Sequence, residues 1–227
     1  MRTMFWAAAM ASALVVTPAL AAAEDQAAGE AKGDAEAGKK LVMQGKPDEP
    51  TVMPCQSCHG QDGKGQAPSK FPRLAGQDMQ YMVKQLKDFA SGDRTNYPTM
   101  TNIAKGMSEE EMWDAARYYH EKQVSVEGAD AEQSVIDMGE QIAERGVPEE
   151  DVPACTSCHG PKGKGVPPVF PQIAGQHASY IKKQLQDWEG GNRANDPAKM
   201  MTEIAPKLSE EQMEAVGAYF SNVDAQN

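Results

Sequence analysis

The sequence predicts an all-α protein made of two tandem domains. Segments repeat at a spacing of about a hundred residues, apolar residues recur at three- and four-residue intervals, and no run alternates apolar and polar residues as a strand would. We expect domain 1 at residues 34–122 and domain 2 at residues 132–227. The segment between them, residues 123–131, is polar, contains Gly128 and reads as a linker too short to let the domains separate far.

The repeat joins several segments of each half. Phe71–Gln77 reads Phe-Pro-Arg-Leu-Ala-Gly-Gln, and its counterpart Phe170–Gln176 reads Phe-Pro-Gln-Ile-Ala-Gly-Gln. Met100 and Met201 are each followed by two residues and then by Ile-Ala. The offset between the copies drifts by only one or two residues, so the insertions are small and lie in loops.

Each half is predicted to contain the same helices. An opening helix ends near Gly45 in the first copy and near Gly146 in the second. A middle helix within Gln77–Ala90 places its apolar residues on one face, namely Met79, Met82, Val83, Leu86 and Phe89. The last helix starts with a capping box in both copies, at Ser108 with Glu111 and at Ser209 with Gln212.

The first residues predict a secretory signal peptide. Arg2 precedes an apolar run from Phe5 to Val16, which is too short to span a membrane and is followed by small residues. The short run disfavours the alternative of an uncleaved membrane anchor. We expect a signal peptide at residues 1–23, cleaved after Ala23, and a flexible leader at residues 24–33. The mature protein is therefore predicted to be exported.

The charge of the chain restricts its partners. The formal net charge is -11, which disfavours binding to nucleic acid and to anionic membranes. An acidic surface attracts a basic docking patch on a protein partner and speeds the encounter. That the acidic residues serve only solubility stays open as an alternative.

All four cysteines lie in two Cys-x-x-Cys-His motifs, at Cys55, Cys58 and His59 and at Cys155, Cys158 and His159. Residues three apart on one helical turn face the same way, so both thiols reach the two vinyl groups of one porphyrin. The adjacent histidine then binds the iron from the proximal side. The motifs predict two covalently bound haem c groups. A thioredoxin-like thiol pair would need a βαβ setting, and a zinc site with adjacent Cys and His is unusual.

A sixth iron ligand is expected downstream of each motif, where the thioether of Met is a common choice. Met100 and Met201 are predicted as these ligands, in loops before the last helix, because both precede the same Ile-Ala pair. Met200 adjoins Met201, but the Ile-Ala spacing selects Met201. His120 and His177 have no counterpart in the other copy, so we expect both on the surface. The methionines on helical faces or at helix entry read as core residues: Met79, Met82, Met107, Met112 and Met213.

These motifs together resemble the two-haem cytochromes c of the cytochrome c4 type, in which each domain resembles a class I cytochrome c, a small helical fold wrapped around one haem. The resemblance covers roughly residues 34–225. It implies that the carbonyls of Pro72 and Pro171 accept a hydrogen bond from the proximal imidazoles. It places Arg94 and Arg193 where a propionate partner would sit, with a solvated arginine as the open alternative.

Gln77 and Gln176 are candidate helix caps.

The predicted ligands also indicate the function. An iron with His on one side and Met on the other has no open site for substrate, which favours an electron carrier over an enzyme. The resemblance implies a periplasmic carrier of a respiratory chain, with a quinol-oxidising complex as donor, a terminal oxidase as acceptor, and peripheral docking at these membrane complexes. The alternatives are an electron-transfer subunit of an enzyme complex, such as a flavocytochrome sulfide dehydrogenase, and a two-haem peroxidase.

Overall fold

A computed structural model describes residues 32–125 and 127–224. Helices joined by loops make up these residues, and no strand occurs among them, which confirms the all-α prediction. The predicted signal peptide at residues 1–23 and most of the predicted leader lie outside the described residues. None of the helices in the described ranges has the length and apolar character needed to cross a membrane.

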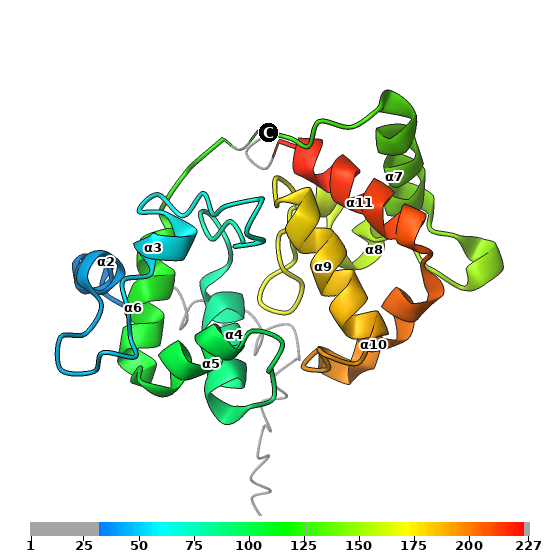
Figure 1. The fold of residues 1–227 in the computed structure, drawn as a ribbon. Coiled ribbons are helices and arrows are strands. Elements are labelled where there is room, and N and C mark those ends of the chain that lie inside the picture. The colour runs from blue at the N-terminus through cyan, green and yellow to red at the C-terminus, as the bar shows by residue number, and fades with distance from the viewer. Residues whose placement is uncertain (1–31, 126, 225–227) are drawn as a thin grey trace, which may run out of the picture.

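The helices fall into two groups that lie side by side (Figure 1). The first group comprises α2 (Ala35–Gln44), α3 (Gln56–His59), α4 (Met79–Ser91), α5 (Pro98–Lys105) and α6 (Glu109–His120). The second comprises α7 (Gln133–Arg145), α8 (Thr156–His159), α9 (Ala178–Glu189), α10 (Met200–Ile204) and α11 (Glu210–Asn222). Short 3-10 turns lie between the helices of this second group, at Pro148–Glu150, Pro161–Gly163, Pro197–Lys199 and Ala205–Lys207. The element order therefore repeats, as the sequence repeat predicts.

Side-chain caps fix where several helices begin. The carboxylate of Asp34 accepts hydrogen bonds from the first turn of α2. Both predicted capping boxes are present, with Ser108 and Glu111 at α6 and Ser209 and Gln212 at α11. Gly45 and Gly146 end α2 and α7 at the predicted positions.

The first and last helices of each group cross at a glycine. An ideal Cβ on Gly38 of α2 would lie 2.0 Å from the backbone oxygen of Asp114 in α6. The equivalent Cβ on Gly139 of α7 would lie 2.0 Å from the oxygen of Ala215 in α11. Only glycine permits this approach of two backbones, so each pair of helices is held at close range.

Each group has its own hydrophobic core. In the first, Leu41 and Val42 of α2 pack with Met82 and Val83 of α4 and with α6. In the second, Ile142, Ile181 and Phe220 bring together α7, α9 and α11. The predicted core methionines are all buried, with exposed fractions from 1% to 9%: Met79, Met82, Met107, Met112 and Met213.

One prediction about secondary structure is wrong. Met100 and Met201 do not lie in loops, because each belongs to a short helix before the last one, α5 and α10 respectively. Pro98 stands at the start of α5, where its fixed φ and missing N–H favour a helix start. In domain 2 the carboxylate of Asp196 accepts the backbone N–H of Thr202 at 2.9 Å and thereby holds the turn that carries Met201.

The two groups meet along α4, α9 and the Phe-Pro-x-x-Ala-Gly-Gln segments. Arg94 and Arg193 pair as an isolated antiparallel bridge across the contact. The side chain of Gln77 donates to the carbonyl of Gln172 at 2.9 Å, and that of Gln176 donates to the carbonyl of Arg73 at 3.0 Å. The two glutamines therefore hold the opposite domain rather than serve chiefly as helix caps, since their buried amides satisfy backbone groups across the interface.

Candidate functional site

Each Cys-x-x-Cys-His motif forms one helical turn. In domain 1 the backbone N–H of His59 donates to the carbonyl of Cys55 at 3.0 Å, and in domain 2 His159 makes the same bond to Cys155 at 2.9 Å. No disulfide links the four cysteines, all of which lie in the described residues. Burial raises the pKa of Cys55 and of Cys155 to about 11.

The two proximal histidines are held alike. Nδ1 of His59 lies 3.1 Å from the carbonyl oxygen of Pro72, and Nδ1 of His159 lies 2.9 Å from that of Pro171. Burial lowers the pKa of both imidazoles, which keeps them neutral, so Nδ1 donates to the carbonyl. The Nε2 lone pair is then left for a metal, and the ring is fixed by its second nitrogen.

Met100 and Met201 occupy equivalent positions against the two cores. Both are partly buried, and each packs against the core of its own domain together with the first cysteine of the motif in that domain. The two predicted methionine ligands therefore take equivalent places relative to the two cores.

In the loop after each motif, a glycine brings the backbone close to an aromatic ring of the last helix. Gly63 has φ +75°, and an ideal Cβ there would lie 2.7 Å from the ring of Tyr119. Gly163 has φ +73°, and its Cβ would lie 2.6 Å from the ring of Phe220. Each glycine also accepts two backbone hydrogen bonds from the loop that follows the proline, so the loop after each motif is closed tightly.

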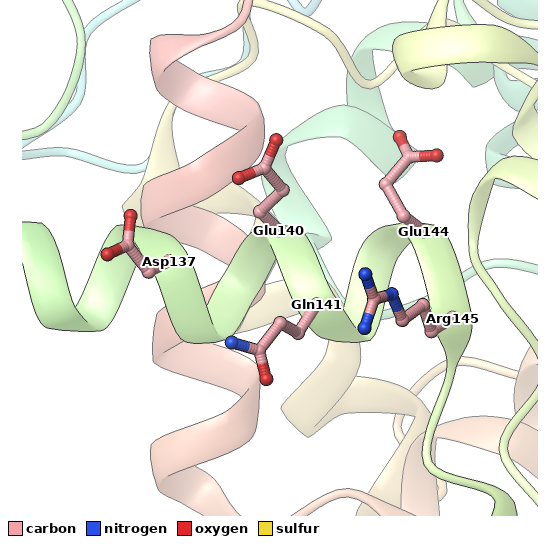
Figure 2. Close-up of a pocket in the computed structure, with 5 residues that line it drawn as sticks. All are labelled: Asp137, Glu140, Gln141, Glu144 and Arg145. Atoms are coloured by element: carbon pink, nitrogen blue, oxygen red, sulfur yellow. The ribbon is translucent and has the colours of Figure 1, made fainter.

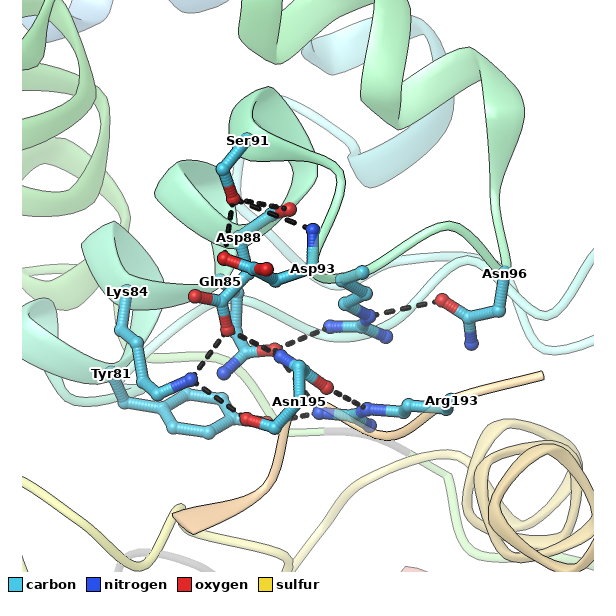
Figure 3. A network of polar contacts seen from close by, with 10 residues as sticks. Tyr81, Lys84, Gln85, Asp88, Ser91, Asp93, Asn96, Arg193 and Asn195 are labelled. Atoms are coloured by element: carbon cyan, nitrogen blue, oxygen red, sulfur yellow. Dashed lines mark hydrogen bonds and ion pairs between the residues drawn. The ribbon is translucent and has the colours of Figure 1, made fainter. Parts of the chain in front are cut away.

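A polar network joins the domains around the two interface arginines (Figure 3). Arg94 donates to Gln85 Oε1 and to Gln184 Oε1, both at 2.8 Å. Arg193 donates to the same two atoms, at 3.0 Å and 2.8 Å respectively. Tyr180 accepts from Arg94 as well, so the network is nearly two-fold symmetric about the interface.

The interface arginines are buried and lack a carboxylate partner. Arg94 is 3% exposed and Arg193 is 4% exposed, which excludes the solvated alternative for both. Within the part of the chain that the structure describes, no carboxylate lies within ion-pair distance of either guanidinium. Two buried cations with only neutral partners are costly, so an anion that enters this region would be bound strongly.

A buried donor without a hydrogen-bond partner lies beside Arg193. The indole Nε1 of Trp188 is buried and has no hydrogen-bond partner among the described residues. The guanidinium carbon of Arg193 lies 4.1 Å from the centre of the Trp188 ring. Phe89 takes the equivalent place in domain 1, 4.5 Å from Arg94. These donors suit the carboxylates of a haem, so the residues present fit the group that the motifs predict.

The two remaining histidines differ. His120 is exposed, as predicted. The prediction for His177 is wrong, because His177 is only 7% exposed and its Nε2 lies 2.8 Å from the carbonyl oxygen of Lys64 in the other domain. It stands just after Gln176 and is buried because the interface covers this segment.

The network contains residues that the sequence reasoning missed. Gln85 and Gln184, Tyr81 and Tyr180 make the interdomain contacts, yet no role was predicted for them. A signal was present, since Tyr and Gln recur four residues apart in both copies. Polar residues retained in both copies of a helix mark a shared polar contact, although their partners lie about a hundred residues away and are set only by docking.

Another surface feature does not belong to these sites. An open depression on α7 is lined by Asp137, Glu140, Gln141, Glu144 and Arg145 (Figure 2). All five lining residues are polar or charged, so the depression lacks the apolar walls that a haem requires.

The fold and the two motifs define a two-domain c-type cytochrome. A cytochrome c family profile matches residues 35–121 and again residues 139–224. The chain is 43% identical over 188 residues to the thiosulfate dehydrogenase electron acceptor of Stutzerimonas stutzeri (82% of this chain, 86% of that protein). It is 40% identical over 171 residues to cytochrome c4 of Pseudomonas aeruginosa (74% and 83%).

Solved structures of related proteins also match the chain. The crystal structure of reduced cytochrome c4 from Pseudomonas stutzeri matches with a TM-score of 0.73 and 36% identity, over 85% of this chain and 100% of that chain. The thiosulfate dehydrogenase of Marichromatium purpuratum matches with a TM-score of 0.77 and 33% identity, over 85% of this chain and 41% of that longer chain. The chain belongs to the cytochrome c4 family of two-haem cytochromes c. It carries two haem c groups and is an electron-transfer protein.

Proposed function

We propose that both irons are closed centres with His and Met as axial ligands. His59 and Met100 bind one iron, and His159 and Met201 bind the other. The thioethers form at Cys55, Cys58, Cys155 and Cys158. The observation that carries this proposal is the equivalence of the two domains, since each has an imidazole with Nδ1 tied to a proline carbonyl and a methionine packed against its core. Haem iron supplies one-electron redox chemistry, and these residues hold it without an open coordination position.

The interface completes the proposed sites. Arg94 and Arg193 hold the haem propionates, because both guanidiniums are buried without a carboxylate among the described residues. The Trp188 indole donates from the side of domain 2. Arg94 and Arg193 lie at the contact between the domains, so propionates held by them would lie near this contact, which would favour electron transfer inside the molecule.

The leading role is that of a periplasmic carrier in a respiratory chain. It takes electrons from a quinol-oxidising complex and passes them to a terminal oxidase. Relatives named cytochrome c4 that match most of this chain support the carrier role. The acidic composition supports docking on basic patches of redox partners.

A second role is favoured by a specific comparison. Two relatives are named as electron acceptors of thiosulfate dehydrogenase, at 43% and 36% identity. The chain also matches part of a thiosulfate dehydrogenase structure. We therefore include a thiosulfate-oxidising enzyme as a candidate donor.

Absorption spectroscopy of the purified protein tests both the carrier role and the identity of the electron donor. The oxidised protein should be reduced rapidly by a candidate donor and reoxidised by a membrane fraction that contains a terminal oxidase. Thiosulfate dehydrogenase with thiosulfate and a quinol-oxidising complex with quinol are compared as donors at equal concentration. Reduction by thiosulfate dehydrogenase alone would replace the quinol-linked role, whereas co-purification with a flavoprotein would favour the subunit alternative.

A further inference from the structure

Charges that are placed alike in the two domains affect both haems equally, so they cancel in the difference between the two reduction potentials. The interface arginines and their glutamine partners form such a matched set. So do the ion pairs of Lys84 with Asp88 and of Lys183 with Asp187. Among the charged groups, only those present in one domain and absent from the other contribute to the difference between the two potentials.

The two domains differ strongly in total charge. Residues 34–122 contain 12 lysines and arginines and 13 aspartates and glutamates, a formal charge of -1. Residues 132–227 contain 8 basic and 15 acidic residues, a formal charge of -7. Reduction adds an electron to the site, so it is opposed more strongly in the more negative domain.

Part of the extra negative charge lies on the helix that contacts the haem motif of domain 2. Asp137, Glu140 and Glu144 lie along α7 (Figure 2). The hydroxyl of Thr156, inside the motif, donates to the carbonyl of Ala143 in α7 at 3.1 Å. The equivalent helix of domain 1, α2, carries one glutamate and two lysines, so its charge has the opposite sign.

A further unmatched charge stands beside the proposed methionine ligand of domain 2. Both carboxylate oxygens of Asp196 accept hydrogen bonds from Thr202, at 2.9 Å and 2.6 Å. In domain 1 the neutral residue Tyr97 takes this place, and its backbone carbonyl accepts from Thr101.

Charge differences between the two interface segments do not offset the extra negative charge of domain 2. In domain 1 the interface segment contains Arg73 and Asp78, whose charges offset each other. Domain 2 has the uncharged side chains Gln172 and His177 at these positions, and burial lowers the pKa of His177. The interface segment therefore adds little net difference.

We propose that the haem of domain 1 has the higher reduction potential, so that electrons enter through the acidic domain 2 from a basic donor protein and come to rest in domain 1. In this step one electron leaves the reduced iron of domain 2 and reduces the ferric iron of domain 1. The inference rests on the proposed axial ligands. The -7 charge of domain 2 also makes it the better docking surface for a basic partner.

A redox titration of the two-haem protein tests the order. Met100→His replaces the proposed thioether ligand of domain 1 with a second imidazole and moves the domain 1 component to lower potential. The component that moves should be the higher of the two wild-type components. Displacement of the lower component would overturn the proposal.

Charge variants supply the second measurement. Asp196→Asn, and the double variant Glu140→Lys with Glu144→Lys, should each shift the lower component upward and leave the higher one in place. The matched control, Lys39→Glu with Lys40→Glu on α2, should lower the higher component. Added salt should narrow the gap because it screens the exposed charges.

These experiments distinguish failure of the proposed order of potentials from failure of the proposed axial ligands. If Met100→His changes neither component and the Fe(III)–Met charge-transfer band persists, the ligand assignment fails. The variants at Asp196, Glu140 and Glu144 still decide the order in that case. An upward shift of the higher component in these variants contradicts the proposal.

Discussion

The guanidinium of Arg94 in one domain donates a 2.8 Å hydrogen bond to Oε1 of Gln184 in the other. The reciprocal bond runs from Arg193 to Gln85 at 3.0 Å. Both arginines are almost fully buried, so the docking of the domains depends on polar groups that have no water to replace a lost partner.

Replacement of Arg94 by Leu should therefore destabilise the protein strongly. The change leaves Oδ1 of Asn96 without its donor, whereas Gln85 and Gln184 keep Arg193 as a donor. An acceptor left without a donor costs about 1–3 kcal/mol, so we expect a loss of about 1–3 kcal/mol. Guanidinium chloride denaturation of the haem-containing protein measures it. The half-exposed Arg117, which pairs with Glu121 on α6, supplies the control. Arg117→Leu should change stability by less than about 1 kcal/mol, and equal losses in both variants would contradict the role of Arg94.

The axial methionines should be separable by substitution. Met100→Ala should remove the low-spin signal of one haem and leave the other unchanged, and Met201→Ala should do the same for the second haem. Electron paramagnetic resonance of the oxidised protein follows both signals. Met82→Leu is the control, because Met82 is a buried core residue whose volume is nearly conserved by Leu. Unchanged spectra in both alanine variants would refute the ligand assignment.

His177 should make stability depend on pH. Burial lowers the pKa of His177 in the folded protein. In the unfolded chain the pKa of an imidazole is about 6.5. At higher pH both states are neutral and stability is constant. As pH falls through about 6.5 the unfolded state binds the proton first, so stability decreases until the lower folded pKa is reached.

Denaturation at about pH 7.5 and about pH 5.5 measures this loss. His177→Gln should reduce the difference between the two pH values, and its amide retains a donor toward the carbonyl of Lys64. The exposed His120 supplies the control, His120→Gln. An unchanged pH difference in His177→Gln would show that the loss arises elsewhere.

The crossing of α2 and α6 should not tolerate a methyl group at Gly38. An added Cβ would lie 2.0 Å from a backbone oxygen, which cannot move aside as a flexible side chain would. We expect Gly38→Ala to cost about 2–3 kcal/mol, as overpacking typically does, in spite of the higher helix propensity of Ala. Thermal unfolding measures it. Ala37→Ser, on the exposed side of the same helix, should be nearly neutral.

The sequence by itself determined the cofactor chemistry of this protein. The spacing within Cys55–His59 and Cys155–His159 is local, and so are the capping serines at Ser108 and Ser209, so neighbouring residues suffice to predict them. The downstream methionines could be predicted as ligands because the duplication supplies two aligned copies. Their helices were missed, since a short helix between Pro98 and Lys105 depends on how the chain closes over the core.

The tertiary structure decided what the buried polar residues do. A sequence pattern does not distinguish a solvated arginine from Arg94, because burial arises only when α4 and α9 meet. The same holds for His177, which resembles a surface histidine at a helix start until the other domain covers it. These roles depend on contacts between residues about a hundred positions apart, and such pairs are set by packing of whole domains rather than by local propensity.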